Sequence, residues 1–439
     1  MKGSRQSIAT WGLEKITFFA VAVGAVILPN TYVLGPQYTV YRIAFLFAIQ
    51  VALLAASKKA RLWSAMGPAT SRLFLASLAF STYMLLVDVV QNGAAQGVLD
   101  FLIRLTVIGL APIGALLLTD FWWRVRILVG ASMIPMVFGA VQVFNPDFSL
   151  PSLTPANPLV GFHTREGLEG YIAATGRIVG TSNISIGFAL LLGVVAVLAY
   201  GLWRHGGSGR LSALAGISSV LLAPMTLTRS LIVGLLPSLG LGRILAGRST
   251  WRSALVAVSV AVGLSMVLWV VLPRLGGVDP RVAQFDDNNT RVKLVSNLYG
   301  VRYALQTRPL TGIAKAELYQ AVVDEYQAGD LPVGVSVDAL LTNHNQFGYL
   351  LRFYGLLGLA LLLLTYGAML RLIFTLQDAN ARAALLGVMI YVTQFSLLHN
   401  VFVYSVPVLW LLLWGIEEDR PASDCKAGVN APTTRAVIS

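Results

Sequence analysis

Long apolar runs separated by short polar stretches make up most of the chain from residue 16 to residue 416. A helix needs about 20 apolar residues to cross roughly 30 Å of hydrocarbon. We therefore predict twelve membrane-spanning helices, near residues 16–35, 38–56, 73–91, 101–119, 127–145, 185–203, 211–227, 230–246, 254–273, 347–370, 384–399 and 401–416. The pattern predicts an all-α integral membrane protein with about 12 transmembrane helices.

Composition supports this interpretation. Charged residues are 12% of the 439 residues, whereas about 25% is usual in a soluble globular chain. Apolar types reach 56%, and mean hydropathy is +0.72. A single cysteine, Cys425, cannot form an internal disulfide. The net charge of +12 would suggest nucleic acid in a soluble protein, but in a membrane protein it reflects topology, and we expect no nucleic-acid partner.

The distribution of Lys and Arg predicts the orientation. Positive residues near span ends are retained in the cytoplasm. With the N-terminus inside, 19 of the 32 Lys and Arg fall in cytoplasmic segments, while the short outer turns near 36, 92–100 and 400 have none. We therefore predict a multi-pass protein of the bacterial inner (cytoplasmic) membrane with both termini inside, and a cytoplasmic tail at 417–439.

Two predicted outer segments are too long to be turns, residues 145–184 and residues 274–346. Long connections without structure are uncommon unless they are functional. The second contains an apolar pattern of helical spacing from Leu294 to Leu305, which predicts short helices on the outer face. The chain is thereby divided into spans one to nine (1–273), a periplasmic loop (274–346), spans ten to twelve (347–416) and the tail.

His344 is the main catalytic candidate. It lies where the long outer loop re-enters the membrane, within Thr342-Asn343-His344-Asn345-Gln346. An imidazole with a pKa near 6.5 is well suited to accept a proton near neutral pH. A lone histidine that only caps a helix or lies at the interface is the alternative.

Arginines on the predicted outer side are the second signal, because a guanidinium binds phosphate oxygens through a rigid fork. Arg229 occupies a minimal turn within an otherwise apolar stretch, and Arg291, Arg302 and Arg308 lie in the long loop. Arg229 could instead extend toward lipid phosphates, and each loop arginine could be a solvated surface charge. Arg177 is similarly ambiguous. For Asp88 and Arg104 we favour a buried pair between neighbouring spans.

Four segments carry a resemblance to a known family. At His344 the chain reads His344-Asn345, nine residues, and then Gly355-Leu-Leu-Gly358. This resembles the histidine motif of the O-antigen ligase and O-antigen polymerase superfamily. Further segments similar to that superfamily, within a likeness that covers about residues 170–416, are Thr228-Arg229-Ser230-Leu231, the run from Arg291 to Arg308-Pro309-Leu310-Thr311-Gly312, and Arg177-Ile-Val-Gly180-Thr-Ser-Asn183.

The resemblance implies a GT-C-like membrane glycosyltransferase with its active site facing the periplasm. Its donor would be a glycan linked to undecaprenyl diphosphate, its acceptor a lipid A-core sugar or a growing glycan, and its other partners membrane lipids. The family suggests metal-independent chemistry, so no metal and no cofactor are expected. We expect Arg229 and Arg291, with Arg302 as a third contact, to bind the diphosphate, and His344 to act as the base in an inverting transfer.

Two other functions remain open. A polymerase of O-antigen or exopolysaccharide repeats would use the same lipid-linked donor as a ligase and differ only in the acceptor. A twelve-span secondary transporter is the alternative from another class. Transporters often carry broken helices in matched halves, whereas this chain shows no matched halves and has its long loop outside and late, which argues against a transporter. Between the two transferases we favour the ligase, because the histidine motif is described for ligases.

Overall fold

The computed structural model describes residues 12–27, 68–118, 120–145, 178, 185–206, 209–226, 228–247, 298–328, 340, 345–398 and 407–413. Within these ranges every regular element is helical. The elements are α1 (Leu13–Ile27), α3 (Pro68–Asn92), α4 (Ala94–Leu117), α5 (Phe121–Phe144), α7 (Ser185–Arg204), α8 (Gly209–Leu222), the short 3-10 helix η4 (Pro224–Thr226), α9 (Arg229–Ala246), α13 (Lys315–Ala328), α15 (Gln346–Thr375), α16 (Ala379–Leu398) and α17 (Pro407–Leu413), and residues 298–307 are helical as well. The all-α prediction is confirmed for this part of the chain.

Four helices in the described ranges are long and apolar enough to cross a membrane. They comprise Pro68–Gln91, Phe121–Phe144, Ile186–Arg204 and Gln346–Thr375. Their outward side chains are apolar too, as in Leu75 and Leu364, each 62% exposed. Apolar surface of this extent is characteristic of a protein that contacts lipid. The runs predicted near 38–56 and 254–273 lie outside the described residues.

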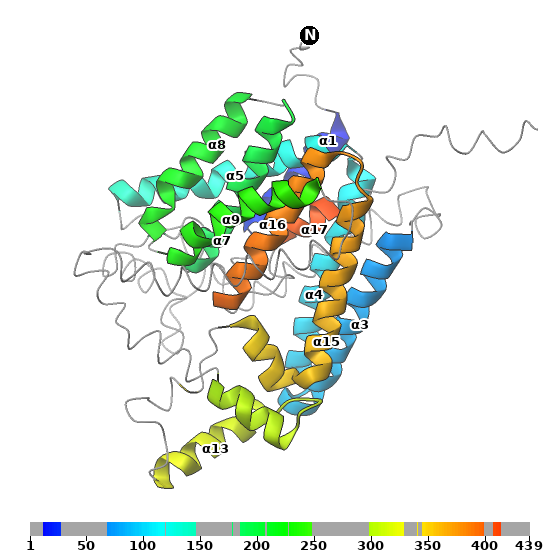
Figure 1. Cartoon of the computed structure of the whole chain (residues 1–439), viewed down its shortest axis with the longest axis vertical. Helices are drawn as coiled ribbons and strands as arrows, with labels where there is room; N and C mark the ends of the chain where they lie inside the picture. The colour runs from blue at the N-terminus through cyan, green and yellow to red at the C-terminus, as the bar shows by residue number, and fades with distance from the viewer. Residues whose placement is uncertain are drawn as a thin grey trace, which may run out of the picture.

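The helices form two groups that contact each other directly, through α15 and α16, and also through α17 (Figure 1). In one group α3 packs between α4 and α15. In the other, α16 packs against α9 and α7, α7 packs against α8, and α1 packs against α5. Helix α17 contacts α4, α1 and α5. The described part of the chain is therefore a helical bundle with continuous packing.

Small residues determine how closely α9 approaches α16. Gly234, Ser238 and Gly242 follow one another at four-residue spacing along one face of α9. A Cβ on Gly242 would lie 2.9 Å from the Ala383 carbonyl oxygen, and one on Gly387 would lie 3.0 Å from the Ser238 carbonyl oxygen. Such spacing lets two backbones pack closely in a membrane. Gly234 and Gly242, on this face of α9, are therefore structural.

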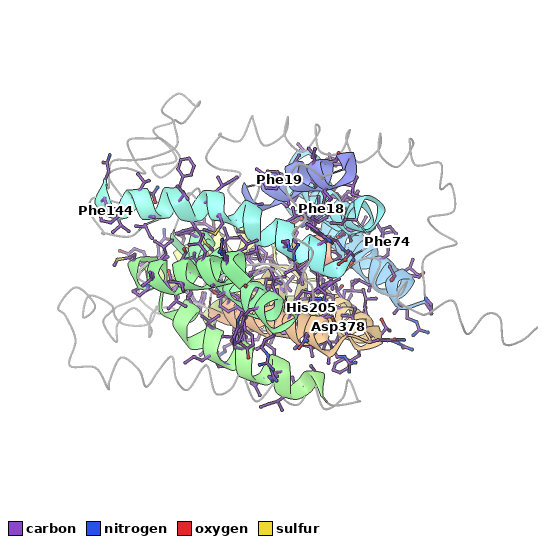
Figure 2. All side chains as sticks on the ribbon, turned by 90° about the horizontal axis from the view of Figure 1, so that it is seen from above. Phe18, Phe19, Phe74, Phe144, His205 and Asp378 are labelled. Carbon is purple, nitrogen blue, oxygen red and sulfur yellow. The ribbon has the colours of Figure 1, made fainter. Side chains whose placement is uncertain are left out.

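Helix ends that the sequence assigns to the cytoplasm lie together at one end of the bundle. His205, just after α7, stacks on Trp122 of α5 with ring centroids 4.4 Å apart. The Trp122 indole donates to Asp378 at 2.7 Å, and His205 and Asp378 lie beside each other (Figure 2). Arg382 donates to the carbonyl of Ala246 at the end of α9. We call this region, defined by these five residues, the basic end.

The opposite end carries helices from the predicted outer loop. Residues 298–307 and α13 lie beyond the ends of α3 and α15 (Figure 1). Burial raises the pKa of the Tyr299 phenol, and the nearby Glu325 carboxylate of α13 raises it further. Tyr299 therefore stays neutral where these two helices meet. Short helices are present in this segment, as its periodicity predicts.

Cysteine labelling tests which end faces the periplasm. In a Cys425→Ser background, Asp287→Cys should react with a membrane-impermeant thiol reagent on intact spheroplasts, because Asp287 lies in the predicted outer loop. Gly207→Cys should react only after the membrane is permeabilised, because Gly207 lies in a loop that the sequence assigns to the cytoplasm. The reverse pattern would invert the orientation and place the candidate site in the cytoplasm.

Candidate functional site

The structure describes the four candidate residues to different extents. His344 and Arg291 lie outside the described residues. Arg229 is the first residue of α9 and follows Thr228, whose backbone is extended. Helix α9 ends at the basic end. The Arg229 backbone therefore lies at the opposite end of that helix, roughly 25 Å away. Arg302 is exposed on the helical residues 298–307.

Asn345 fixes the start of the helix that follows His344. Its backbone is extended, and its side chain accepts a hydrogen bond from the N–H of Gly348 at 2.9 Å. This is the standard capping geometry at a helix N-terminus. The asparagine that follows the histidine in the motif therefore sets where α15 begins.

Helix α15 is broken at the first glycine of the motif. Gly355 has φ 63° and ψ −164°, a region that is essentially restricted to glycine. The break separates a short segment, 346–354, from a long one, 356–375, and Figure 1 shows the two segments meeting at a sharp bend. The long segment alone has about the 20 residues that a span requires.

The backbone groups freed at this bend bind a distant segment. The N–H groups of Leu356 and Leu357 donate to the carbonyls of Pro309 (2.8 Å) and Leu310 (3.2 Å). The N–H of Ile313 donates in the other direction, to the carbonyl of Arg352 (2.9 Å). Three backbone hydrogen bonds therefore join the Pro-x-x-Gly run to the histidine motif.

Glycines permit this contact on both sides. A Cβ on Gly355 would collide with the Leu310 backbone, and a Cβ on Gly312, which has φ 72°, would collide with the backbone of Phe353. The last glycine of the motif, Gly358, lies where a Cβ would be 2.5 Å from the Tyr354 Cβ. Each motif glycine therefore marks a close approach that a larger residue would prevent.

Side chains of α3 stabilise the bend from the other side. The Tyr83 hydroxyl donates to the carbonyl of Tyr354 at 2.8 Å, and the Gln91 amide donates to that of Phe353 at 3.3 Å. Carbonyls left without helical partners by a break need such donors, because an unsatisfied buried carbonyl is costly. Helix α3 therefore stabilises the bend.

Asp88 and Arg104 form the buried pair that the sequence favours. Asp88 is 3% exposed, and its Oδ2 lies 3.4 Å from an Nη atom of Arg104 across α3 and α4. Its other oxygen accepts from the Tyr354 hydroxyl at 2.7 Å. The pair therefore also holds the residue immediately before the bend, a contact that the sequence did not predict.

Arg352 is a buried residue near the bend that the sequence pattern did not single out. This side chain is fully buried, donates to the Leu340 carbonyl at 3.4 Å and occupies the space that a Cβ on Gly300 would need. It joins α15 to the helical residues 298–307. The available signal was a single arginine inside the apolar run at 347–370, because a charge there must face the protein or a cavity.

The loop arginines differ from Arg352 in their surroundings. Gly300 and Ala304 are buried on one face of their helix, whereas Arg302 lies on the exposed face. Arg308 pairs with Glu317 of α13 at 3.4 Å, with both side chains partly exposed. Such surface pairs contribute about 0–1 kcal/mol. Arg308 therefore forms a surface ion pair, whereas the Arg302 side chain is exposed to solvent.

Comparisons with protein-family models and with curated proteins return no match. The functional argument therefore depends on the motif residues and on their geometry. In that geometry the first segment of α15 (346–354), the Pro-x-x-Gly run and α3 meet at one bend. His344 directly precedes, in the sequence, the N-cap of the helix that these contacts fix. No group of three or more His, Cys, Asp or Glu that could hold a metal occurs in the described ranges.

Proposed function

We propose that the chain is an O-antigen ligase-like glycosyltransferase of the bacterial inner membrane, with about 12 spans of GT-C-like arrangement. It transfers a polysaccharide from undecaprenyl diphosphate to a sugar of lipid A-core at the periplasmic face. The observation that carries the proposal is the set of backbone hydrogen bonds between residues 309–313 and the Gly355 bend. Two segments that separately resemble the superfamily are thereby in direct contact.

The proposed chemistry needs few groups. The acceptor hydroxyl attacks the anomeric carbon opposite the diphosphate, a new C–O bond forms, and the bond to the diphosphate oxygen breaks with inversion. His344 takes the acceptor proton, and the arginines bind the departing diphosphate. A diphosphate is already a good leaving group, so orientation and charge stabilisation supply most of the acceleration.

Asn345 and the bend support the role of His344. A general base must lie within hydrogen-bond reach of the hydroxyl that it deprotonates. The Asn345 cap and the contacts of residues 309–313 hold the helix that begins directly after His344. The backbone that follows His344 is therefore fixed, and this supports our assignment of the histidine as the catalytic base.

Arginine substitutions test the diphosphate clamp. We expect Arg229→Ala and Arg291→Ala each to lower transfer roughly 100-fold, the usual cost of removing a group that stabilises developing charge. Lysine should restore activity only in part, because it lacks the guanidinium fork. Arg308→Ala is the matched control, since Arg308 pairs with Glu317. Normal transfer by an alanine variant at normal membrane levels would remove that arginine from the site.

A deletion strain distinguishes ligase from polymerase. Loss of a ligase leaves polymer on its lipid carrier, and the lipid A-core stays without it. Loss of a polymerase leaves single repeats attached to the core. We expect the first pattern, detected by separating the lipopolysaccharide and lipid-linked fractions on gels. The second pattern would replace the ligase assignment by the polymerase one.

A further inference from the structure

Two cavities lie next to each other near the basic end, away from the bend. The first, of about 200 Å³, is bounded by α7, α9 and α16 and partly open to the surface, and its polar lining comprises Tyr200, Arg204, Ser238, Arg243 and Asn380. The second, of about 320 Å³, lies among α7, α8 and α9. Both cavities are lined by Tyr200 and Leu239. A polar cavity thus borders directly on a second one.

The first cavity carries two positive charges. The guanidinium of Arg204 lies 6.0 Å from the Trp203 ring centroid, and no acidic side chain in the described ranges pairs with Arg204 or Arg243. Asp378, the residue before α16, accepts from Trp122 and from the N–H of Asn380. Asp378 itself does not line the cavity. An anion is the ligand that two such arginines favour.

The second cavity is apolar and open to the surface of the bundle. Apart from Ser212 and the Tyr200 hydroxyl, its lining is apolar. Three of its side chains are well exposed, namely Trp203 (54%), Ile217 (59%) and Val220 (57%). In a membrane such a groove is filled by hydrocarbon. An occupant of both cavities must therefore combine an anionic group with an apolar chain.

We propose that the two cavities form one binding site for an anionic phospholipid. Its phosphodiester binds Arg204 and Arg243, Asn380 and Tyr200 donate to the remaining headgroup oxygens, and one acyl chain lies along the groove between α7 and α8. A soluble phosphate would leave the groove unused. A zwitterionic lipid adds a positive charge beside the arginines. This site lies away from the bend and does not depend on the proposed transferase activity.

The sequence supports a lipid of this class. The ends that form the first cavity are those that Lys and Arg assign to the cytoplasm, and basic pockets between helices on that side are suited to acidic headgroups. Arg204 ends α7, and Arg243 lies in the last turn of α9. Both therefore lie at helix ends that the charge distribution assigns to the cytoplasmic face.

Lipid titration of the purified full-length protein tests the proposal. In detergent, native mass spectrometry should show one phosphatidylglycerol bound at least 10-fold more tightly than phosphatidylcholine with the same acyl chains. Arg204→Gln and Arg243→Gln should each weaken phosphatidylglycerol binding about 10-fold, as expected for a lost charged hydrogen bond. Arg210→Gln is the matched control, because Arg210 is exposed at the start of α8 and lines neither cavity.

Two further measurements distinguish a phospholipid from a soluble phosphate as the ligand. Ala213→Trp adds bulk at an exposed position in the groove and should weaken phosphatidylglycerol binding while both arginines stay in place. Glycerol 3-phosphate at millimolar concentration should not displace the lipid. Equal binding of the two lipids, or wild-type binding by both glutamine variants, would overturn the proposal. Displacement by glycerol 3-phosphate would indicate a site for soluble phosphate and would overturn it too.

Folding of the variants has its own control. Arg204 and Arg243 are exposed, so their substitution is not expected to affect the core. Arg204→Lys and Arg243→Lys keep the charge and should retain the preference for phosphatidylglycerol with a smaller loss of affinity. Loss of the preference in these lysine variants, with an unchanged circular dichroism spectrum, would also contradict the proposed phosphate contact.

Discussion

His344→Ala is expected to lower the rate of glycan transfer about 100-fold or more, the usual range for removing a positioned base. Donor binding should be largely kept, because the arginines rather than the histidine contact the diphosphate in this account. The measurement is single-turnover transfer with saturating lipid-linked donor, together with a separate donor-binding titration. A large loss of donor binding with little loss of rate would assign His344 to the diphosphate instead.

His344→Gln distinguishes a base from a residue that only positions the acceptor. Glutamine can form hydrogen bonds but cannot take up a proton near neutral pH. We therefore expect the glutamine variant to be as slow as the alanine variant. Turnover near the wild-type rate would show that His344 orients the acceptor, and that the arginines and exclusion of water provide the catalysis.

Gly355→Ala is expected to abolish transfer and to destabilise the protein. An alanine at φ 63° and ψ −164° is held in a region that costs about 1–3 kcal/mol for a residue with a side chain. Its Cβ would also collide with the Leu310 backbone. Either the bend straightens or residues 309–313 separate from it, and in both cases the support of the segment after His344 is lost.

Gly367→Ala is the matched control for Gly355. Gly367 lies in the same helix, and a Cβ there would meet no heavy atom within 4 Å. We expect the control to keep full activity and an unchanged thermal midpoint of unfolding. In the same detergent, the Gly355 variant should lose activity and unfold at a lower temperature. Normal transfer and a normal midpoint in Gly355→Ala would show that the bend is not required.

Hydrophobic runs predicted several helices closely, since length and composition determine a span. The run at 185–203 corresponds to α7, Ser185–Arg204, and the run at 230–246 to α9, Arg229–Ala246. Charge in an apolar segment was equally informative, because Asp88 must find a partner there and does so in Arg104. In these cases the cause lies within the segment or its neighbour.

The break at Gly355 has a cause that lies elsewhere in the chain. Glycine is common in membrane helices and often only permits close packing, so its presence in the run at 347–370 did not indicate a bend. The conformation depends on the carbonyls of Pro309 and Leu310 and on the hydroxyl of Tyr83. Only the tertiary structure brings these groups to one place.

The same distinction between causes within a segment and causes in the tertiary structure applies to the candidate site. The motif identified His344 and the segments around it, and the structure joins two of these segments at the bend. Arg352 escaped notice because averaging over an apolar run hides one charge, and its burial depends on Gly300 and Leu340. The cavity lined by Arg204 and Arg243 likewise required the packing of three helices.

In vitro transfer tests the central claim most directly. The purified chain is incubated with an undecaprenyl-diphosphate glycan and with lipid A-core, and the products are analysed by mass spectrometry and linkage analysis. We predict that the glycan moves to a lipid A-core sugar with inverted anomeric configuration and release of undecaprenyl diphosphate, and that His344→Ala greatly slows it. Absence of any glycan transfer by folded, monodisperse protein with both substrates present would contradict the account.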